Sequence, residues 1–167
     1  MSRWLPEPLD ERGCDVADRY RRFRFDFIEN PPTVFAPRTF RIDSTLVDGR
    51  EKSFLKLTTT GDPDYIHDPY RCSRIHWGKV IINESGVESS PRVISWCTKQ
   101  NGEKRIKIAP TNFSYLIILA VRERSVRLVT GFYPHNKHER VKLDKECRRA
   151  IRDAAIDVEF KLEFPAK

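Results

Sequence analysis

The sequence predicts an α+β fold: an antiparallel sheet of four to five strands with helices packed on one face, and an N-terminal helical extension. Two observations carry this prediction. Two segments with helical periodicity come first, over residues 10–28 and 69–83, and short extended runs joined by tight turns follow from residue 92. The length of 167 residues is enough for one domain with its own apolar core.

The first helix is predicted from apolar residues that recur on one side of a helix, namely Val16, Tyr20, Phe23 and Phe27. Asn30-Pro31-Pro32 ends it, because proline cannot donate the backbone hydrogen bond that a helix needs. Thr39 to Asp43 is a candidate strand. Asp48-Gly49 is a turn signal, so residues 40–57 are expected to form a hairpin or an irregular pairing.

Asp68-Pro69 predicts the start of the second helix, with aspartate as its N-cap and proline at its first position. This helix is expected to run to about Asn83. Arg71 and Arg74 are three residues apart and therefore neighbours on its surface.

The second half of the chain predicts an antiparallel meander. The expected strands are residues 92–98, 104–109, 115–122 and 126–133, and Asn101-Gly102 is the strongest hairpin signal among them. The unbroken apolar run from Tyr115 to Val121 suits a central strand buried on both faces. Asp144 is expected to cap a last helix, and residues 160–164 alternate like an edge strand.

Charge and composition favour some classes of partner and cellular location over others. The net charge is +7, and residues 99–152 alone hold 14 basic and 5 acidic side chains, which suits an RNA or DNA partner. The longest apolar run has seven residues, too short to cross a membrane, and Met1 to Pro6 does not resemble a signal peptide. The four scattered cysteines are interpreted as free thiols of a reducing compartment. A cytoplasmic protein is therefore expected, with delivery into the cytoplasm of a target cell as a variant.

The residue types present suit cleavage of RNA without a metal or another cofactor. Sequence spacings typical of metal sites, phosphate-binding glycine loops and nucleophile elbows are absent. RNA cleavage needs a base for the 2′-OH proton, an acid for the departing 5′-oxygen and cations for the phosphate. The side chains that can supply these functions are Arg71, Arg74, His76, His138, Arg140 and Lys142.

The run from Asp68 to Ile82 resembles the R-x-x-R-I-x-W-x-x-x-[IL]-[IL] helix of phage and prophage nuclease-like domains. These belong to the superfamily that groups barnase, EndoU, the tRNase colicins and the RelE toxins, here called the BECR fold. The segments Arg105 to Ile108, Tyr115 to Leu119 and Arg127 to Phe132 are also similar to it. The resemblance covers about residues 54–150, so it divides the chain into an extension (1–53) and a nuclease-like α+β domain (54–167), which together form one compact unit. It implies a helix across the sheet and an RNA groove over the sheet.

The resemblance also implies site residues. Arg71, Arg74 and Trp77 match the helix motif and Thr130 matches the strand motif, whereas Phe132 stands where that family has a tyrosine. Three alternatives follow: a bulge re-aims Tyr133, a histidine takes over the role of the hydroxyl, or the domain is inactive. The predicted catalytic residues are His138, with His76 as its alternative, Arg74 and Thr130. The predicted substrate-binding residues are Arg71, Lys79, Tyr133, Arg140 and Lys142.

These residues favour a toxin-type ribonuclease that acts on tRNA or another structured RNA. The alternatives are a non-catalytic RNA- or DNA-binding module and a phage-associated interaction protein. A toxin would also need an acidic antitoxin or immunity protein to cover its basic groove. No membrane partner is expected.

Overall fold

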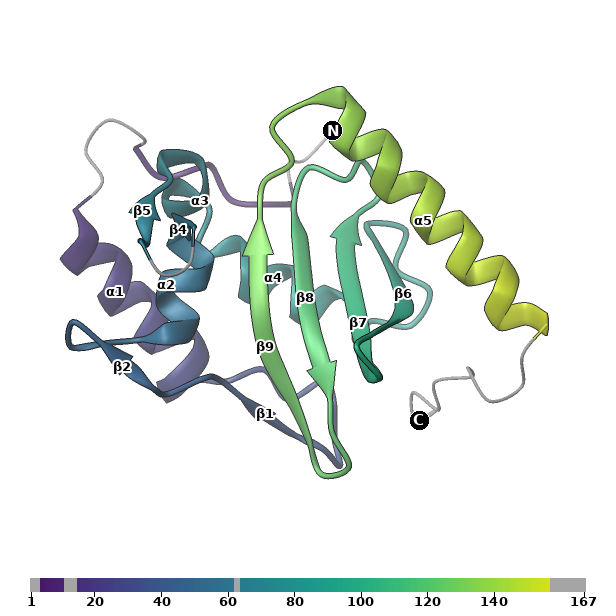
Figure 1. Cartoon of the computed structure of the whole chain (residues 1–167), viewed down its shortest axis with the longest axis horizontal. Helices are drawn as coiled ribbons and strands as arrows, with labels where there is room; N and C mark the ends of the chain where they lie inside the picture. Colours follow the sequence, from purple (N-terminus) through teal and green to yellow (C-terminus); the bar gives the residue numbers. More distant parts are fainter. Residues whose placement is uncertain (1–3, 11–14, 62–63, 157–167) are drawn as a thin grey trace.

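A computed structural model describes residues 4–10, 15–61 and 64–156, with side chains to residue 153, and it has an α+β fold (Figure 1). The helices are α1 (Val16–Arg24), its π-helical continuation η1 (Phe25–Glu29), α2 (Lys52–Thr58), α3 (Pro69–Ser73), α4 (Trp77–Glu84) and α5 (Lys137–Ile156). The strands are β1 (Thr39–Arg41), β2 (Leu46–Val47), β3 (Arg50–Glu51), β4 (Thr59–Thr60), β5 (Ile66–His67), β6 (Val93–Gln100), β7 (Glu103–Pro110), β8 (Leu116–Val121) and β9 (Ser125–Phe132).

The main sheet has the order β1-β9-β8-β7-β6, and the predicted meander of β6 to β9 is confirmed. Asn101 and Gly102 both have positive φ angles, 52° and 75°, as the turn between β6 and β7 requires. β8 is the central strand of the five, which confirms the prediction from its apolar run. The remaining strands form two-stranded pairs, β2 with β3 around Asp48-Gly49 and β4 with β5.

The prediction of a purely antiparallel sheet is wrong, because β1 pairs with β9 in parallel. Phe40 lies opposite Val126, and both side chains are buried. The meander strands are joined by tight turns, which force antiparallel pairing. β1 is separated from β9 by about half of the chain, so no turn constrains its direction and the sequence held no signal for it.

The prediction that helices cover one face is also wrong. Figure 1 shows α4 behind the strands, where it packs with Ile117 and Leu119 of β8 in the larger core. α5 packs on the opposite face, where Cys147 joins Leu116 and Trp96 in a second cluster. A central strand that is apolar on both faces must be shielded from water on both, so a helix packs on each face of the sheet.

Three predicted helix boundaries differ from the structure. The helix predicted over residues 69–83 is two helices, because the backbone departs from helical geometry at Arg74 (φ −113°, ψ 12°). α5 begins seven residues before Asp144, since the Asn136 side chain accepts a hydrogen bond from Glu139 N and caps it. α1 begins after Asp15, whose side chain accepts from two backbone N–H groups. Residues 11–14 of the predicted first helix and the predicted strand over 160–164 lie outside the described residues.

One larger core joins the N-terminal part of the chain to the rest. Phe23, Phe27 and Phe40 pack in it together with Phe54 and Ile75. The sequence missed α2, which buries Phe54, Leu55 and Leu57 and lies beside β9. Cys72, Cys97 and Cys147 are free thiols. In the ranges described, no helix is long and apolar enough to cross a membrane.

Candidate functional site

A β-bulge at Val129 determines which way the end of β9 faces. Leu119 of β8 pairs with Leu128, but the next residue back, Ile118, pairs with Thr130, so Val129 is the extra residue. Because of this extra residue, the side chains that follow Val129 point to the opposite face of the sheet from the one that the alternation before it would give. Gly131 now faces the larger core, while Phe132 packs against the cluster under α5. Tyr133 leaves the strand on the side of α3, as the stacking of its ring on Tyr70 shows.

Two arginines of the α3 turn contact these two rings. The Arg71 guanidinium carbon lies 5.6 Å from the Phe132 ring centroid, and that of Arg74 lies 4.5 Å from the Tyr133 centroid. Both are cation–π geometries. Arg74 is only 9% exposed, and its Nη1 donates to the Tyr70 carbonyl (3.1 Å) and to Ser73 Oγ (2.9 Å). Tyr70 stacks on Tyr133 with 5.7 Å between the ring centroids.

Asp68 joins the α3 turn to the loop before α5. Its Oδ1 caps α3 by accepting from Tyr70 N and Arg71 N, and the residue is 6% exposed. Its Oδ2 lies 3.5 Å from Arg71 Nε and 3.4 Å from His135 Nε2. The His135 side chain is 46% exposed, and its ring meets the edges of the Tyr70 and Tyr133 rings.

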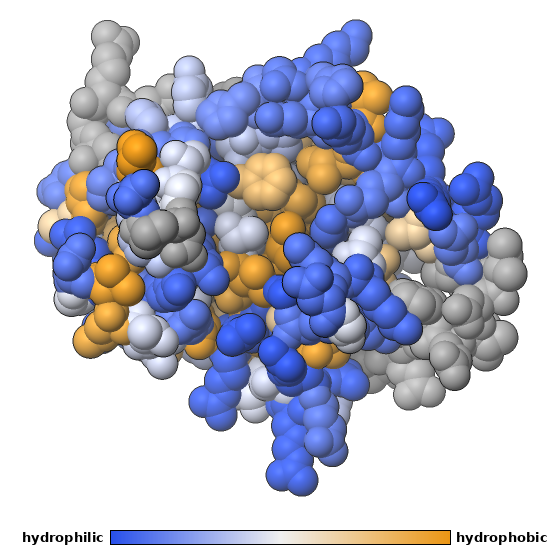
Figure 2. Space-filling view, in the orientation of Figure 1, coloured by the Kyte–Doolittle hydropathy of each residue, from blue (hydrophilic) through white to orange (hydrophobic). Residues whose placement is uncertain are grey.

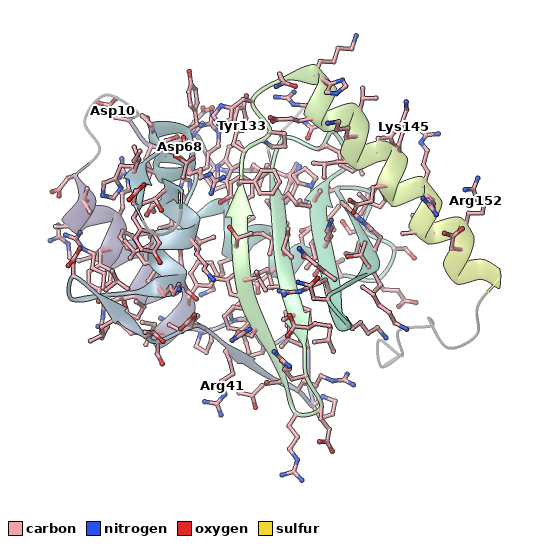
Figure 3. The ribbon with its side chains drawn as sticks, in the orientation of Figure 1. Asp10, Arg41, Asp68, Tyr133, Lys145 and Arg152 are labelled. Carbon is pink, nitrogen blue, oxygen red and sulfur yellow. The ribbon has the colours of Figure 1, made fainter. Side chains whose placement is uncertain are left out.

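α5 contributes Arg140 to the same place. Its Nη2 donates to the Tyr133 hydroxyl oxygen at 3.1 Å, and its guanidinium also lies against the Tyr133 ring. We call the resulting group the tyrosine–arginine cluster; it consists of Asp68, Tyr70, Arg71, Arg74, Tyr133, His135 and Arg140. Figure 3 shows Asp68 and Tyr133 at the same end of the molecule, one on each side of the boundary between α3 and the sheet.

Thr130 lies beside this cluster. Its hydroxyl donates to the Lys56 carbonyl at 2.9 Å, and Arg71 Nη1 approaches the same carbonyl at 3.5 Å. Arg71 Nη1 also donates to the Thr59 carbonyl at 2.8 Å. Thr130 of β9 and Arg71 of α3 therefore both donate to backbone carbonyls at the C-terminal end of α2.

The structure places His76 and Lys79 away from the cluster. His76 is buried, its Nε2 donates to the Glu7 carbonyl (3.2 Å), and burial lowers its pKa, with Arg22 adding to the effect. The Lys79 ammonium lies 5.8 Å from the ring of Phe25 in η1. Both side chains therefore face the N-terminal part of the chain. Even on an unbroken helix, His76 would point away from Arg74, because residues two positions apart lie on opposite sides.

His138 and Lys142 are exposed on α5. His138 lies in the first turn of this helix rather than in a loop, because α5 begins at Lys137. Of the nine predicted site residues, Arg71, Arg74, Tyr133 and Arg140 come together in the cluster, with Thr130 beside them.

The sequence analysis missed Tyr70, Asp68 and His135 as members of the site. Asp68 was interpreted as a helix cap, which it is, but its second oxygen also faces His135. His135 is the first of two histidines that follow the strand. Its position two residues after Tyr133 is the signal that could have distinguished it from His138.

The cluster offers three functions at the surface: an exposed aromatic face on Tyr70, an imidazole held against a buried carboxylate, and a guanidinium at a phenolic hydroxyl. When the Nε2 proton of a histidine faces a carboxylate, Nδ1 is left for proton transfer. Within the described ranges, no group of three His, Cys, Asp or Glu side chains could hold a metal ion. Comparison with protein-family models, curated proteins and solved structures finds no match to this chain.

Proposed function

We propose that this protein binds RNA at the tyrosine–arginine cluster and cleaves it by metal-independent general acid–base chemistry. The observation that carries the proposal is the His135 imidazole beside the buried Asp68 carboxylate, at 3.4 Å, in a half-exposed position. A carboxylate partner sets the tautomer of a histidine and stabilises its charged form after proton uptake. The last part of the basic segment from Lys99 to Arg152 forms α5, which reaches the cluster through Arg140, and its excess of cations suits a polyanionic substrate.

The proposed reaction assigns one role to each of four members of the cluster. His135 takes the proton from the 2′-OH, whose oxygen bonds to the phosphorus, and the bond to the 5′-oxygen breaks. The Tyr133 hydroxyl, next to Arg140, gives its proton to that leaving oxygen. Arg140 stabilises the negative charge on the phosphate, and Tyr70 stacks on an unpaired base. The products are a 2′,3′-cyclic phosphate and a 5′-hydroxyl.

This assignment corresponds to the first of the three alternatives for Tyr133. The bulge at Val129 brings a tyrosine hydroxyl to the end of the strand although Phe132 occupies the usual position. The proposal retains the expected BECR-type relationship, tRNA or another structured RNA as the target, an acidic antitoxin or immunity protein as a second partner, and the cytoplasm as the place of action.

A second candidate function is RNA binding without cleavage. Its support comes from Arg71 and Arg74, whose guanidinium groups donate to backbone carbonyls or lie on rings and are largely buried. Arginines that are held in this way maintain a surface rather than grip a phosphate. The sequence, in contrast, predicted Arg74 as a catalytic residue and Arg71 as a substrate-binding residue.

The test is incubation of the purified protein with total tRNA in EDTA, followed by mapping of the RNA ends. We expect 2′,3′-cyclic phosphate ends, and a loss of about 10²–10⁴-fold in rate for His135→Ala with little change in RNA affinity. The control is His67→Ala. His67 is exposed on β5, and its Nδ1 lies 3.8 Å from Cys72 Sγ rather than beside a carboxylate.

His138→Ala distinguishes the two histidines. If it abolishes cleavage and His135→Ala does not, the proton-transfer role belongs to His138 as the sequence predicted. If the wild type binds RNA but leaves every RNA intact, the binding module is the correct function.

A further inference from the structure

The outward face of α5 is a continuous row of positive charge. Six lysine and arginine side chains on this helix are exposed: Lys137, Lys142, Lys145, Arg148, Arg149 and Arg152. The five from Lys142 to Arg152 follow at spacings of three, four and seven residues, which place them on one side of the helix, opposite Leu143, Cys147 and Ala150 on the sheet. Lys137 lies five residues before Lys142, at the start of the helix. Figure 3 shows Lys145 and Arg152 pointing away from the ribbon, and Figure 2 shows largely hydrophilic surface along this helix.

The acidic residues of α5 do not cancel this charge. Glu146 turns to the sheet and accepts from Trp96 Nε1 and Lys107 Nζ, and Glu139 accepts from the backbone N–H of His135. Asp144 lies 3.0 Å from Arg148, and Asp153 lies 3.5 Å from Arg149 and 3.8 Å from Arg152. Five cations therefore share the outward side with two carboxylates.

The row begins at the tyrosine–arginine cluster. α5 starts two residues after His135, and Arg140 in its second turn contacts Tyr133. Twenty helical residues extend about 30 Å, so the row leads from the cluster across the molecule as a rigid rod. A rod of cations matches the regularly spaced phosphates of a duplex better than those of a flexible single strand.

We propose that the outward face of α5 binds the phosphate backbone of an RNA duplex whose unpaired flanking nucleotide lies at the tyrosine–arginine cluster. This inference rests on the proposed function and deepens it, since it defines the substrate as a stem next to a single-stranded site. An anionic membrane surface fits this face less well. A helix that lies in a membrane interface needs a broad apolar side. The apolar side of α5 is packed on the sheet, and the exposed apolar residues Val141 and Ile151 are ten positions apart among the cations.

The test compares two labelled RNAs on the cleavage-deficient His135→Ala background, so that binding is measured independently of catalysis. One is a hairpin with a stem of about ten base pairs, long enough to follow α5, and the other is the loop sequence alone. The α5 variant carries Lys142→Gln, Lys145→Gln and Arg152→Gln. The matched control carries Arg38→Gln, Arg41→Gln and Arg124→Gln, which removes the same charge from exposed positions at β1 and the β8–β9 turn. Figure 3 shows Arg41 at the end of the molecule away from the cluster.

For the α5 variant we expect at least a tenfold loss of affinity for the hairpin near 0.1 M salt, a shallower salt dependence, and less than a twofold change for the loop RNA. The control variant should bind both RNAs like its parent. Equal weakening of both RNAs, equal weakening by the control, or no binding of the hairpin by the parent would overturn the inference. Binding to anionic vesicles that is lost in the α5 variant, without a preference for the hairpin, would also overturn it.

The two proposals fail in different ways. Hairpin binding through α5 without cleavage by the wild type supports this surface and contradicts the ribonuclease. Cleavage that is equally fast with and without a stem contradicts the duplex surface and leaves the ribonuclease intact.

Discussion

Asp68 Oδ2 lies 3.4 Å from His135 Nε2, although one residue caps the short helix α3 and the other lies in the loop that leads into α5. The opposite oxygen of the same carboxylate accepts two backbone N–H groups. Asp68 thus couples the start of a helix to the one histidine of the tyrosine–arginine cluster.

The substitution Asp68→Asn keeps the helix cap and removes the negative charge beside His135. Asparagine caps helices about as well as aspartate, so the unfolding temperature should change little, whereas the charge that faces His135 and Arg71 is lost. We expect at least a tenfold loss in cleavage rate. The matched control is Asp15→Asn, because Asp15 caps α1 in the same way and is exposed. If both variants cleave like the wild type, the Asp68 charge has no part in the reaction.

His76 predicts a pH dependence of stability. Burial lowers its pKa in the folded protein below the usual 6.5, so the unfolded chain takes up its proton first as the pH falls. The stability that neutral His76 contributes is therefore complete above pH 6.5 and declines from there towards its folded-state pKa. Nδ1 has no hydrogen-bond partner among the described residues, so protonation would also bury an unsatisfied N–H group.

The measurement is urea unfolding at pH 7.5, 6.0 and 5.0. We expect the free energy of unfolding to fall less steeply with acidification in His76→Gln than in the wild type, because glutamine does not titrate and retains a donor for the Glu7 carbonyl. Parallel pH curves for the two proteins would show that His76 does not contribute to acid sensitivity.

Gly131 is expected to be intolerant of any side chain. A Cβ there would lie 2.8 Å from Ile117 Cδ1 and 2.9 Å from Leu57 Cδ2, and both neighbours are fully buried. Gly131→Ala should cost about 1–3 kcal/mol in the free energy of unfolding, measured with denaturant. Gly102→Asn is the comparison, since Gly102 has open space and a φ of 75° that asparagine tolerates. A loss in Gly131→Ala no larger than that in Gly102→Asn would show that the bulge can shift to make room.

Glu146 is expected to anchor α5 to the sheet. Its Oε1 accepts from Trp96 Nε1 at 2.8 Å and from Lys107 Nζ at 2.7 Å, and the Lys107 side chain is largely buried. Glu146→Ala should cost about 1.5–3 kcal/mol, because it leaves the ammonium without its acceptor. Asp144→Ala, which removes only the ion pair with exposed Arg148, should cost less than about 1 kcal/mol. Thermal unfolding of both variants measures the difference, and equal losses would contradict the anchoring role.

Local signals in the sequence predicted most of the meander and the start of α3. Asn101-Gly102 adopts the two positive φ angles of the hairpin, and Asp68-Pro69 begins α3. The unbroken apolar run along β8 predicted burial of both faces, which the two cores confirm. These features depend on backbone geometry and on neighbours a few residues away, so the sequence of a short window contains them.

Only the tertiary structure decided the site. The sequence by itself determined that arginines at positions 71 and 74, two rings at the end of β9 and two histidines after it were available. The bulge at Val129 determines which ring faces α3, and the packing of α4 places His76 against Glu7 and Lys79 against Phe25 in the N-terminal part of the chain. A one-residue shift exchanges the faces of a strand, and its position depends on packing between segments far apart in the chain. The same reason applies to the parallel pairing of β1 and to the meeting of Asp68 with His135, since long-range contacts leave no periodic trace in the residues that make them.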